Sequence, residues 1–224
     1  MPSPPKSRTG AAAQPRPLPP PAYHHGALRE ALLAATEALL LESGVDAFTL
    51  RACARRAGVS HAAPAHHFGD VRGLLTAFAT VGLDRLADQM EAYLLAAPAQ
   101  PMDRLVAVGQ AYIDFALAHR AHFQLMFGSD RLDSGSAELA RAGQRSSEPL
   151  RRALAEVMAA HRLPPDSLPG RMLLAWSAVH GYATLVLEGR CLDPFGLSVD
   201  QPKRARAAAH DMLVLLGPAL ASTA

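Results

Sequence analysis

The chain of 224 residues is poor in aromatic side chains, cysteine and lysine. Aromatic residues make up 5% of it, and Lys6 and Lys203 are the only lysines among 22 basic residues. The two cysteines, Cys53 and Cys191, lie far apart, so neither a disulfide framework nor a metal-ligand spacing is expected, and a reducing cytoplasm is the expected location. The net charge of +2 excludes a global basic field, so any contact with nucleic acid must be local.

Long apolar runs and enzyme signatures are missing as well. The nearest approach to a membrane span, LLAWSAVHGYATLVL at 173–187, is too short and contains His180, so no span is predicted. The N-terminus lacks the apolar core of a secretory signal. There is no glycine-rich phosphate loop, nucleophile elbow, paired carboxylates at useful spacing or cluster of metal ligands. We therefore expect no enzymatic activity, no cofactor and no membrane contact.

Half of the residues are hydrophobic, and the mean hydropathy is +0.06. Together with abundant alanine and leucine, this composition favours a helical globular protein. The exception is residues 1–22, which hold 8 of the 18 prolines and only three charged residues, Lys6, Arg8 and Arg16. This segment cannot build a core and is predicted to be a disordered basic tail. It is either inert or an arm that touches phosphates or a minor groove.

Apolar residues recur at spacings of three and four along most of the chain, which indicates amphipathic helices. The pattern predicts an all-α fold, with a three-helix N-terminal domain over 23–70 and a larger helical domain over 71–224. Gly44 is expected to end the first helix, and Thr49 to cap the second. The predicted helices cover 23–44, 50–58, 61–67, 71–97, 102–127 with a bend near Arg120, 136–163 as one helix or two, 171–190 and 203–221.

Residues 58–68, GVSHAAPAHHF, have the features of the turn and second helix of a helix-turn-helix. Gly58 lacks Cβ and suits a positive φ between two helices, and Ser60 is a good N-cap for the helix at 61–67. Pro64 falls at the fourth position of that helix, where it should remove a backbone bond and bend or stiffen it. The exposed face has no acidic group and can enter a major groove without repelling phosphate. It carries His61, Ala62, Ala65 and His66.

The run from Tyr23 to Leu75 resembles the N-terminal DNA-binding domain of TetR-family transcriptional regulators. The resemblance rests on the amphipathic first helix and on FTL at 48–50, ARRAGVS at 54–60, HF at 67–68 and LL at 74–75. It implies that a double-stranded DNA operator is the partner of this domain. The residues that it places at or near the DNA are Thr49, Ser60, His61, Ala62, His66 and His67.

Two further contacts are expected, and two departures from the family pattern weaken phosphate anchoring. His25 lies at a helix start, where exposed amides favour an anion, so it is either a phosphate contact or a solvated end. Most family members carry tyrosine where this chain has Ala65, and many carry lysine where it has Val71. Arg72, one position later, is expected to replace that charge.

The segment 171–190 resembles the WHG-type C-terminal domain of one TetR subgroup, whose Trp, His and Gly match Trp176, His180 and Gly181. This helix and the one at 203–221 are more apolar than a monomer readily covers, and the resemblance implies that they form the interface of a homodimer. It also implies an apolar cavity for a small-molecule effector. The candidate lining residues, for each of which ordinary core is the favoured alternative, are Tyr112, Phe115, Phe123, Met126, Phe127, Met172 and Trp176.

These observations predict a dimeric repressor that binds a near-palindromic operator and is released by a small molecule. Activation stays open, because a DNA-binding domain alone does not set the sign of regulation. The alternative is a metal- or redox-responsive regulator with the same DNA-binding domain. It would need His119, His122 or His180 to converge with each other or with a cysteine, and no third and fourth ligand is evident.

Overall fold

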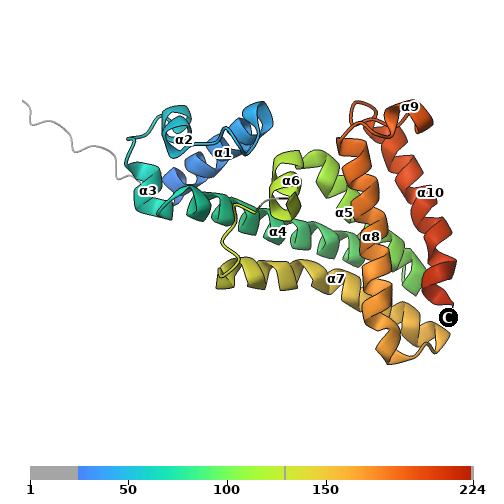
Figure 1. The fold of residues 1–224 in the computed structure, drawn as a ribbon. Coiled ribbons are helices and arrows are strands. Elements are labelled where there is room, and N and C mark those ends of the chain that lie inside the picture. The colour runs from blue at the N-terminus through green and yellow to red at the C-terminus, as the bar shows by residue number, and fades with distance from the viewer. Residues whose placement is uncertain (1–24, 129, 223–224) are drawn as a thin grey trace, which may run out of the picture.

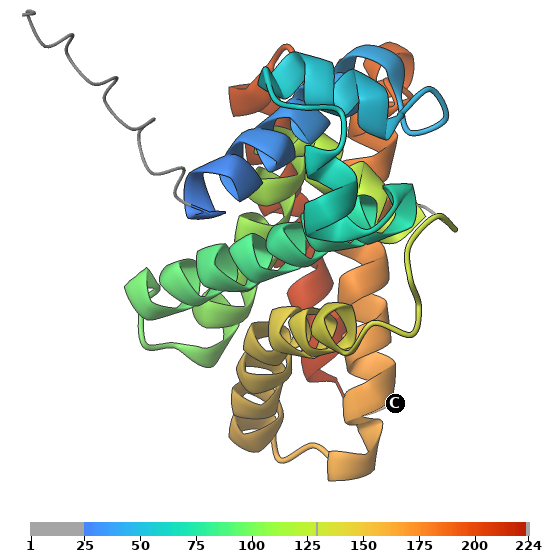
Figure 2. The ribbon, with the colours of Figure 1, turned by 90° about the vertical axis from the view of Figure 1, so that its left-hand side faces the viewer.

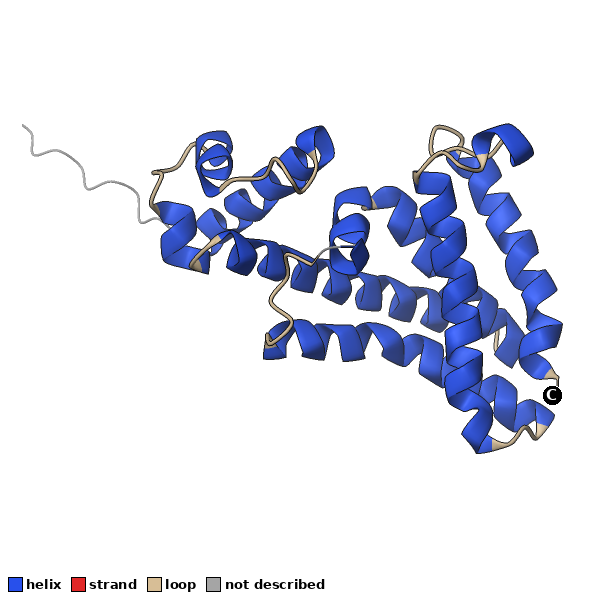
Figure 3. Cartoon of the chain, viewed as in Figure 1, coloured by secondary structure: helices blue, strands red, loops and turns tan. Residues whose placement is uncertain are grey.

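The computed structural model describes residues 25–128 and 130–222, and every regular element in these two ranges is helical (Figure 3). The predicted all-α fold is thus confirmed, whereas the predicted tail at 1–22 lies outside the described residues. In chain order the elements are α1 (His25–Ser43), α2 (Leu50–Ala57), α3 (Ala63–Phe68), α4 (Val71–Ala96), α5 (Pro101–Ala118), α6 (Arg120–Gly128), α7 (Ala137–His161), the 3₁₀ turn η1 (Pro165–Ser167), α8 (Leu168–Leu187), α9 (Leu192–Phe195) and α10 (Pro202–Ala221).

The helices form a small head, α1–α3, and a larger body, α4–α10 (Figure 1). The head packs on the N-terminal part of α4, which then continues into the body beside α5 and α7. At the far end of the body, α8 and α10 pack against each other and against α5. The view turned by 90° shows α4 passing below the head while α8 runs almost vertically behind it (Figure 2).

Two local signals in the head, at Thr49 and Gly58, form as the sequence predicts. The Thr49 hydroxyl caps α2 by accepting from the Ala52 amide at 3.1 Å. Gly58 ends α2 with φ of +67°, a conformation that a residue without Cβ adopts at little cost. The Asp70 carboxylate caps α4 by accepting from the Gly73 amide at 2.8 Å. These caps fix where the chain turns between the three helices of the head and α4.

The predicted start of the helix at 61–67, the second helix of the helix-turn-helix, was wrong. Residues 61–62 form a turn, α3 begins at Ala63, and Ala62 occupies the cap position without a side-chain bond. Ser60 contributes only its backbone carbonyl, which accepts from the Ala63 amide at 3.0 Å. Pro64 therefore lies in the first turn, where its missing amide hydrogen breaks no helical bond. It is buried, and as the second residue of α3 it is compatible with the first turn of the helix.

Other boundaries differ in smaller ways. The segment predicted as one helix or two is one continuous helix, α7, with Pro149 inside it. The bend predicted near Arg120 is the break between α5 and α6, with His119 as the C-cap residue after α5. A short helix, α9, occupies part of the loop expected at 191–202.

Two hydrophobic cores meet at α4 and α6. The head core contains Leu32 and Cys53 of the head together with Leu74 and Phe78 of α4, and Leu125 of α6 joins it. The body core is built from α4, α5, α7, α8 and α10. Met126 packs against both. The head is therefore held to the body by buried apolar side chains of α4 and α6.

Candidate functional site

The residues predicted to contact DNA lie around the turn before α3, on α3 itself and at the start of α4. Ser60, His61, Ala62 and His66 are exposed, and His67 is half-buried with its ring 6.3 Å from that of Phe68. The remaining predicted contacts are Thr49 before α2 and Arg72 at the start of α4, both exposed, and His25 as the first residue of α1, whose side chain is outside the description.

The turn between α3 and α4 is unusually tight. A Cβ on Gly73 would collide with the carbonyl oxygen of Phe68, at a separation far shorter than real Cβ atoms show. The contact is with backbone, which cannot swing aside as a flexible side chain can. Gly73 therefore lets α3 approach the first turn of α4, and this fixes the orientation of α3 relative to α4.

Behind the head, His122 of α6 joins α6 to α4. It is buried, stacked on the Phe78 ring at 3.8 Å between centroids. Its Nδ1 lies 3.2 Å from the Phe78 carbonyl oxygen, and its Nε2 lies 3.1 Å from Arg85 Nη1. Burial, helped by the Arg85 charge, lowers the pKa of His122 to about 4. The neutral ring thus donates from Nδ1 to Phe78 and accepts at Nε2 from Arg85.

The geometry gives no support to metal or redox sensing. Across the described ranges, no group of three or more His, Cys, Asp and Glu side chains could hold a metal ion. The rings of His119 and His122 are 6.4 Å apart, and both nitrogens of His122 are engaged within the protein. His180 binds a tyrosine hydroxyl. Cys53 and Cys191 are buried in separate clusters.

A cavity of ≈ 460 Å³ lies in the body. Its walls come from α4, α5, α6, α7, α8 and α10, so it is enclosed by most of the long helices. Among the residues that the structure describes, no charged side chain and no histidine lines it. Leu173 and Trp176 line it and are 60% and 42% exposed, so the cavity reaches the surface at α8. Such a volume and lining are typical of sites for small organic molecules.

Four of the seven residues predicted to line a ligand cavity do line this one: Tyr112, Phe127, Met172 and Trp176. Phe115, Phe123 and Met126 are not on its wall. Phe115 and Phe123 are buried in the body core, and Met126 packs between the two cores. The apolar pattern of the sequence does not distinguish side chains that are packed in a core from side chains that line a cavity.

A hydrogen-bonded cluster lies at one wall of the cavity. The Tyr112 hydroxyl is 2.8 Å from His180 Nδ1, and Trp176 donates its indole N–H to the same hydroxyl at 3.2 Å. Burial raises the pKa of Tyr112 and lowers the pKa of His180, so both rings stay neutral. Because the indole hydrogen of Trp176 points at the hydroxyl oxygen, we assign the Tyr112 hydrogen to His180 Nδ1, which places the imidazole proton on Nε2.

Sequence reasoning missed the contribution of α7 to the cavity. Gly143 and Ser146 line it from successive turns of α7, followed by Leu150. A Cβ on Gly143 would meet no atom within 4 Å. The signal that could have revealed this wall is the pair of small residues, Gly143 and Ser146, at a spacing of three on one face of the helix.

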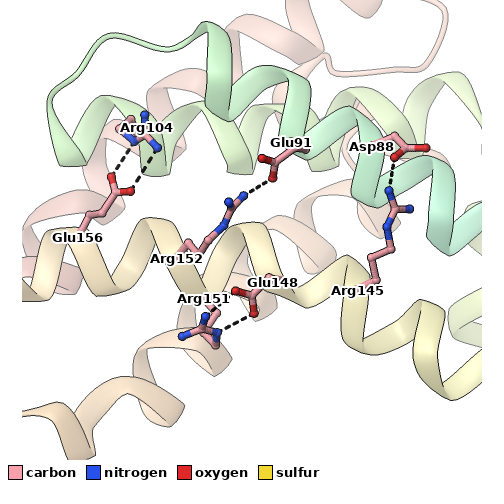
Figure 4. Close-up of polar contacts among 8 residues, drawn as sticks. All are labelled: Asp88, Glu91, Arg104, Arg145, Glu148, Arg151, Arg152 and Glu156. Carbon is pink, nitrogen blue, oxygen red and sulfur yellow. Dashed lines mark hydrogen bonds and ion pairs between the residues drawn. The ribbon is translucent and has the colours of Figure 1, made fainter.

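Ion pairs tie α7 to its neighbours α4 and α5 (Figure 4). Arg145 pairs with Asp84 at 3.1 Å and also with Asp88, both on α4. Further along, Arg152 pairs with Glu91 of α4, and Arg104 of α5 pairs with Glu156 at 2.6 Å. These side chains are partly exposed, so each pair adds little stability. They nevertheless join the α7 wall of the cavity to the helix that carries the head.

Two helices at the far end of the body expose large apolar side chains. Leu215 of α10 is 79% exposed, and Leu173 and Leu174 of α8 and Val214 of α10 are also exposed. A soluble monomer rarely leaves such a set of side chains in water, so this face is suited to an interface. In the part of the chain that the structure describes, no helix combines the length and apolarity needed to cross a bilayer.

Comparisons with known proteins agree with this architecture. Residues 32–78 match the family model described as bacterial regulatory proteins, tetR family, and residues 105–209 match the model described as tetracyclin repressor-like, C-terminal domain. A search of curated proteins finds no match. A structure of a protein of unknown function from Rhodococcus sp. RHA1 is 38% identical, with 88% of this chain and 100% of that chain covered and a TM-score of 0.71.

Two further solved structures share the fold. The TetR-family regulator PfmR from Thermus thermophilus is 21% identical, with 82% of this chain and 97% of that chain covered and a TM-score of 0.65. The transcriptional regulator FadR from Bacillus subtilis, determined in complex with stearoyl-CoA, is 14% identical, with 84% and 96% covered and a TM-score of 0.65. With both halves matched to family models and the fold shared over nearly the whole of these structures, the chain belongs to the TetR family of DNA-binding transcriptional regulators.

Proposed function

We propose that this regulator is a homodimeric repressor that binds a near-palindromic operator and leaves it when a small molecule occupies the body cavity. In this proposal residues 23–70 form the DNA-binding domain, and residues 71–224 form the ligand-binding and dimerisation domain. The observation that carries it is the double role of α4. Phe78 of α4 belongs to the head core, and Leu83, Leu86 and Met90 of the same helix line the cavity.

The DNA end of the proposal rests on exposure and charge. The turn before α3 and α3 itself present His61, Ala62 and His66 to solvent, which suits close approach to base edges in a major groove. Further DNA contacts in this proposal are Thr49, Ser60, His67 and His25, and Arg72, which is exposed at the start of α4, supplies a positive charge for phosphate. Operator DNA lies in the cytoplasm of a bacterial cell, where we expect the protein to act.

The dimer rests on the exposed apolar side chains of α8 and α10. Burying them against a second copy removes them from water, which is the dominant favourable term in most protein association. A two-fold dimer would present two copies of α3, and its operator would carry two half-sites roughly 34 Å apart, one helical turn of DNA.

Release requires that the effector favour one arrangement of the two heads over another. A ligand shifts such an equilibrium only by the difference between its affinities for the two states. Occupation of the cavity would press on α4 directly and on α7, which is ion-paired to α4 through Arg145 and Arg152. A tilt of α4 would then change the separation of the two heads.

The test is selection of bound sequences from a library of random duplexes by the purified full-length protein. We expect enrichment of one near-palindromic sequence whose half-sites are about one helical turn apart. Enrichment of a single unrepeated half-site would contradict the dimeric operator, and no enrichment at all would contradict sequence-specific binding.

A further inference from the structure

The side chains that line the cavity restrict which molecules the cavity can bind. The inference drawn from them rests on the proposed function of the cavity as the effector site. Its ≈ 460 Å³ gives room for about 15 non-hydrogen atoms, if each takes roughly the 30 Å³ of a water molecule in the liquid. Leucine, methionine and valine side chains from α4, α5, α7, α8 and α10 make up most of the wall. An occupant must therefore be largely hydrocarbon to replace water there with a net gain.

A charged occupant has no partner in this wall. Within the described residues, no lysine, arginine, histidine, aspartate or glutamate lines the cavity. An ionised carboxylate or phosphate buried without a counter-charge loses its hydration with nothing to replace it. His180, which is linked to the wall through Tyr112, is held neutral by burial, because burial lowers its pKa. The wall thus offers no counter-charge to a buried anion or ammonium group.

The few polar side chains on the wall share one property: their hydrogens are already donated within the protein. The Tyr112 hydroxyl donates to His180, and the Trp176 indole donates to Tyr112. Ser146 donates to the Gly143 carbonyl oxygen at 2.9 Å, and Ser147 donates to that of Gln144 at 2.8 Å. What remains toward the cavity is oxygen lone pairs, which can accept a hydrogen bond but cannot offer one.

We infer that the effector is a neutral hydrocarbon molecule with a hydroxyl group, an alcohol or a phenol. A hydroxyl supplies the hydrogen that the wall lacks, whereas a carboxylate, an ester or an ether supplies only further acceptors. A primary amine would also donate, but it is cationic at neutral pH and would be buried without a counter-charge.

Trp176 provides a direct reading of binding, because it is the only tryptophan in the sequence and lines the cavity. The probes are 1-decanol, its isomer 1-methoxynonane, which has no hydroxyl hydrogen, and decanoate at pH 7.5. Each is titrated below its solubility limit into the full-length protein, with Trp176 emission and calorimetry as independent readouts. We expect saturable binding of 1-decanol about three- to tenfold tighter than that of 1-methoxynonane, the range of one neutral hydrogen bond. Decanoate should bind at least about tenfold more weakly than 1-decanol.

Gly143→Leu tests whether the probe occupies this cavity. Gly143 lines it and has open space where a side chain would begin, so leucine fills the cavity without a clash in the helix. The matched control is Gly170→Leu on α8, which is exposed, also has open space and is not on the wall. The first variant should lose 1-decanol binding at unchanged or higher melting temperature, and the second should keep it.

Several outcomes would overturn the inference. Decanoate that binds as tightly as 1-decanol would exclude selection against anions, and equal affinities of 1-decanol and 1-methoxynonane would exclude recognition of a hydroxyl hydrogen. Unchanged 1-decanol binding in Gly143→Leu, or no binding of any probe to the wild type, would also refute it. These results are separate from the proposed DNA binding, which is measured on the same protein without any probe.

Discussion

At the scale of single residues, His122 carries the clearest pH dependence. Its pKa is about 4 in the folded protein against an ordinary value of 6.5, so the unfolded chain binds the proton more readily. The stabilisation that depends on its neutral form is complete above pH 6.5 and is lost as the pH falls from 6.5 toward 4. Each pH unit in this window costs about 1.4 kcal/mol of the free energy of unfolding.

We expect His122→Gln to flatten that loss. A glutamine can still donate to the Phe78 carbonyl and accept from Arg85, but it does not titrate. Urea unfolding of both proteins from pH 7.5 to pH 4 gives the two profiles. The control is His161→Gln at the exposed end of α7, whose profile should match that of the wild type. An equally steep profile for His122→Gln would mean that other groups set the acid sensitivity.

Gly73 and Gly143 are both helical glycines, and we expect opposite results when each is changed to alanine. Gly73→Ala forces a Cβ against the Phe68 carbonyl oxygen and should lower the free energy of unfolding by about 1–3 kcal/mol. Gly143→Ala meets open space and should raise it by about 0.5–1 kcal/mol, because alanine has less backbone entropy to lose. Urea unfolding at pH 7.5 measures both changes. Equal stability of Gly73→Ala and the wild type would show that the α3–α4 turn relaxes freely.

At the scale of elements, the start of α4 is expected to anchor the head on phosphate through Arg72. Arg72→Gln should weaken binding to all duplexes by a similar factor and reduce the slope of log K against log salt concentration by about one per protomer. Fluorescence anisotropy at four salt concentrations measures both quantities. Lys203→Gln, at an exposed site at the start of α10, serves as the control and should leave the slope unchanged. If Arg72→Gln changed the affinity for one sequence alone, Arg72 would contact base edges rather than phosphate.

The sequence predicts elements best where one local signal decides the conformation. Thr49 caps α2 and Gly58 ends it, as expected, because each acts on backbone groups beside it. At α3 two local signals predict different helix starts. The structure has no serine cap at Ser60, and a turn instead places Pro64 in the first helical turn. Long-range packing is beyond such signals. Packing between distant segments buries Phe115 in the core and places Gly143 on the cavity wall. The apolar pattern of the sequence predicts neither position, because it marks Phe115 as a lining candidate and gives no signal at Gly143.

At the scale of the whole molecule, the exposed face of α8 and α10 should hold two copies together. Leu215→Asp places a charge on a side chain that is 79% exposed, so the monomer should fold normally while the dimer is destabilised. Sedimentation velocity should then give half the mass of the wild type, and operator affinity should fall with it. Leu95→Asp, at a side chain 74% exposed on α4, is the matched control and should leave the mass unchanged. A dimeric Leu215→Asp variant would place the interface elsewhere.

The proposed regulation depends on the binding of one operator by the two heads of a dimer. It is measured by anisotropy of a labelled duplex that carries the most enriched selected sequence, against a scrambled duplex of the same composition, at two salt concentrations. We expect tight binding to the selected duplex alone, saturating at two protomers per duplex. Equal, weak and steeply salt-dependent binding to both duplexes would reflect phosphate attraction only, and would refute operator reading by this protein.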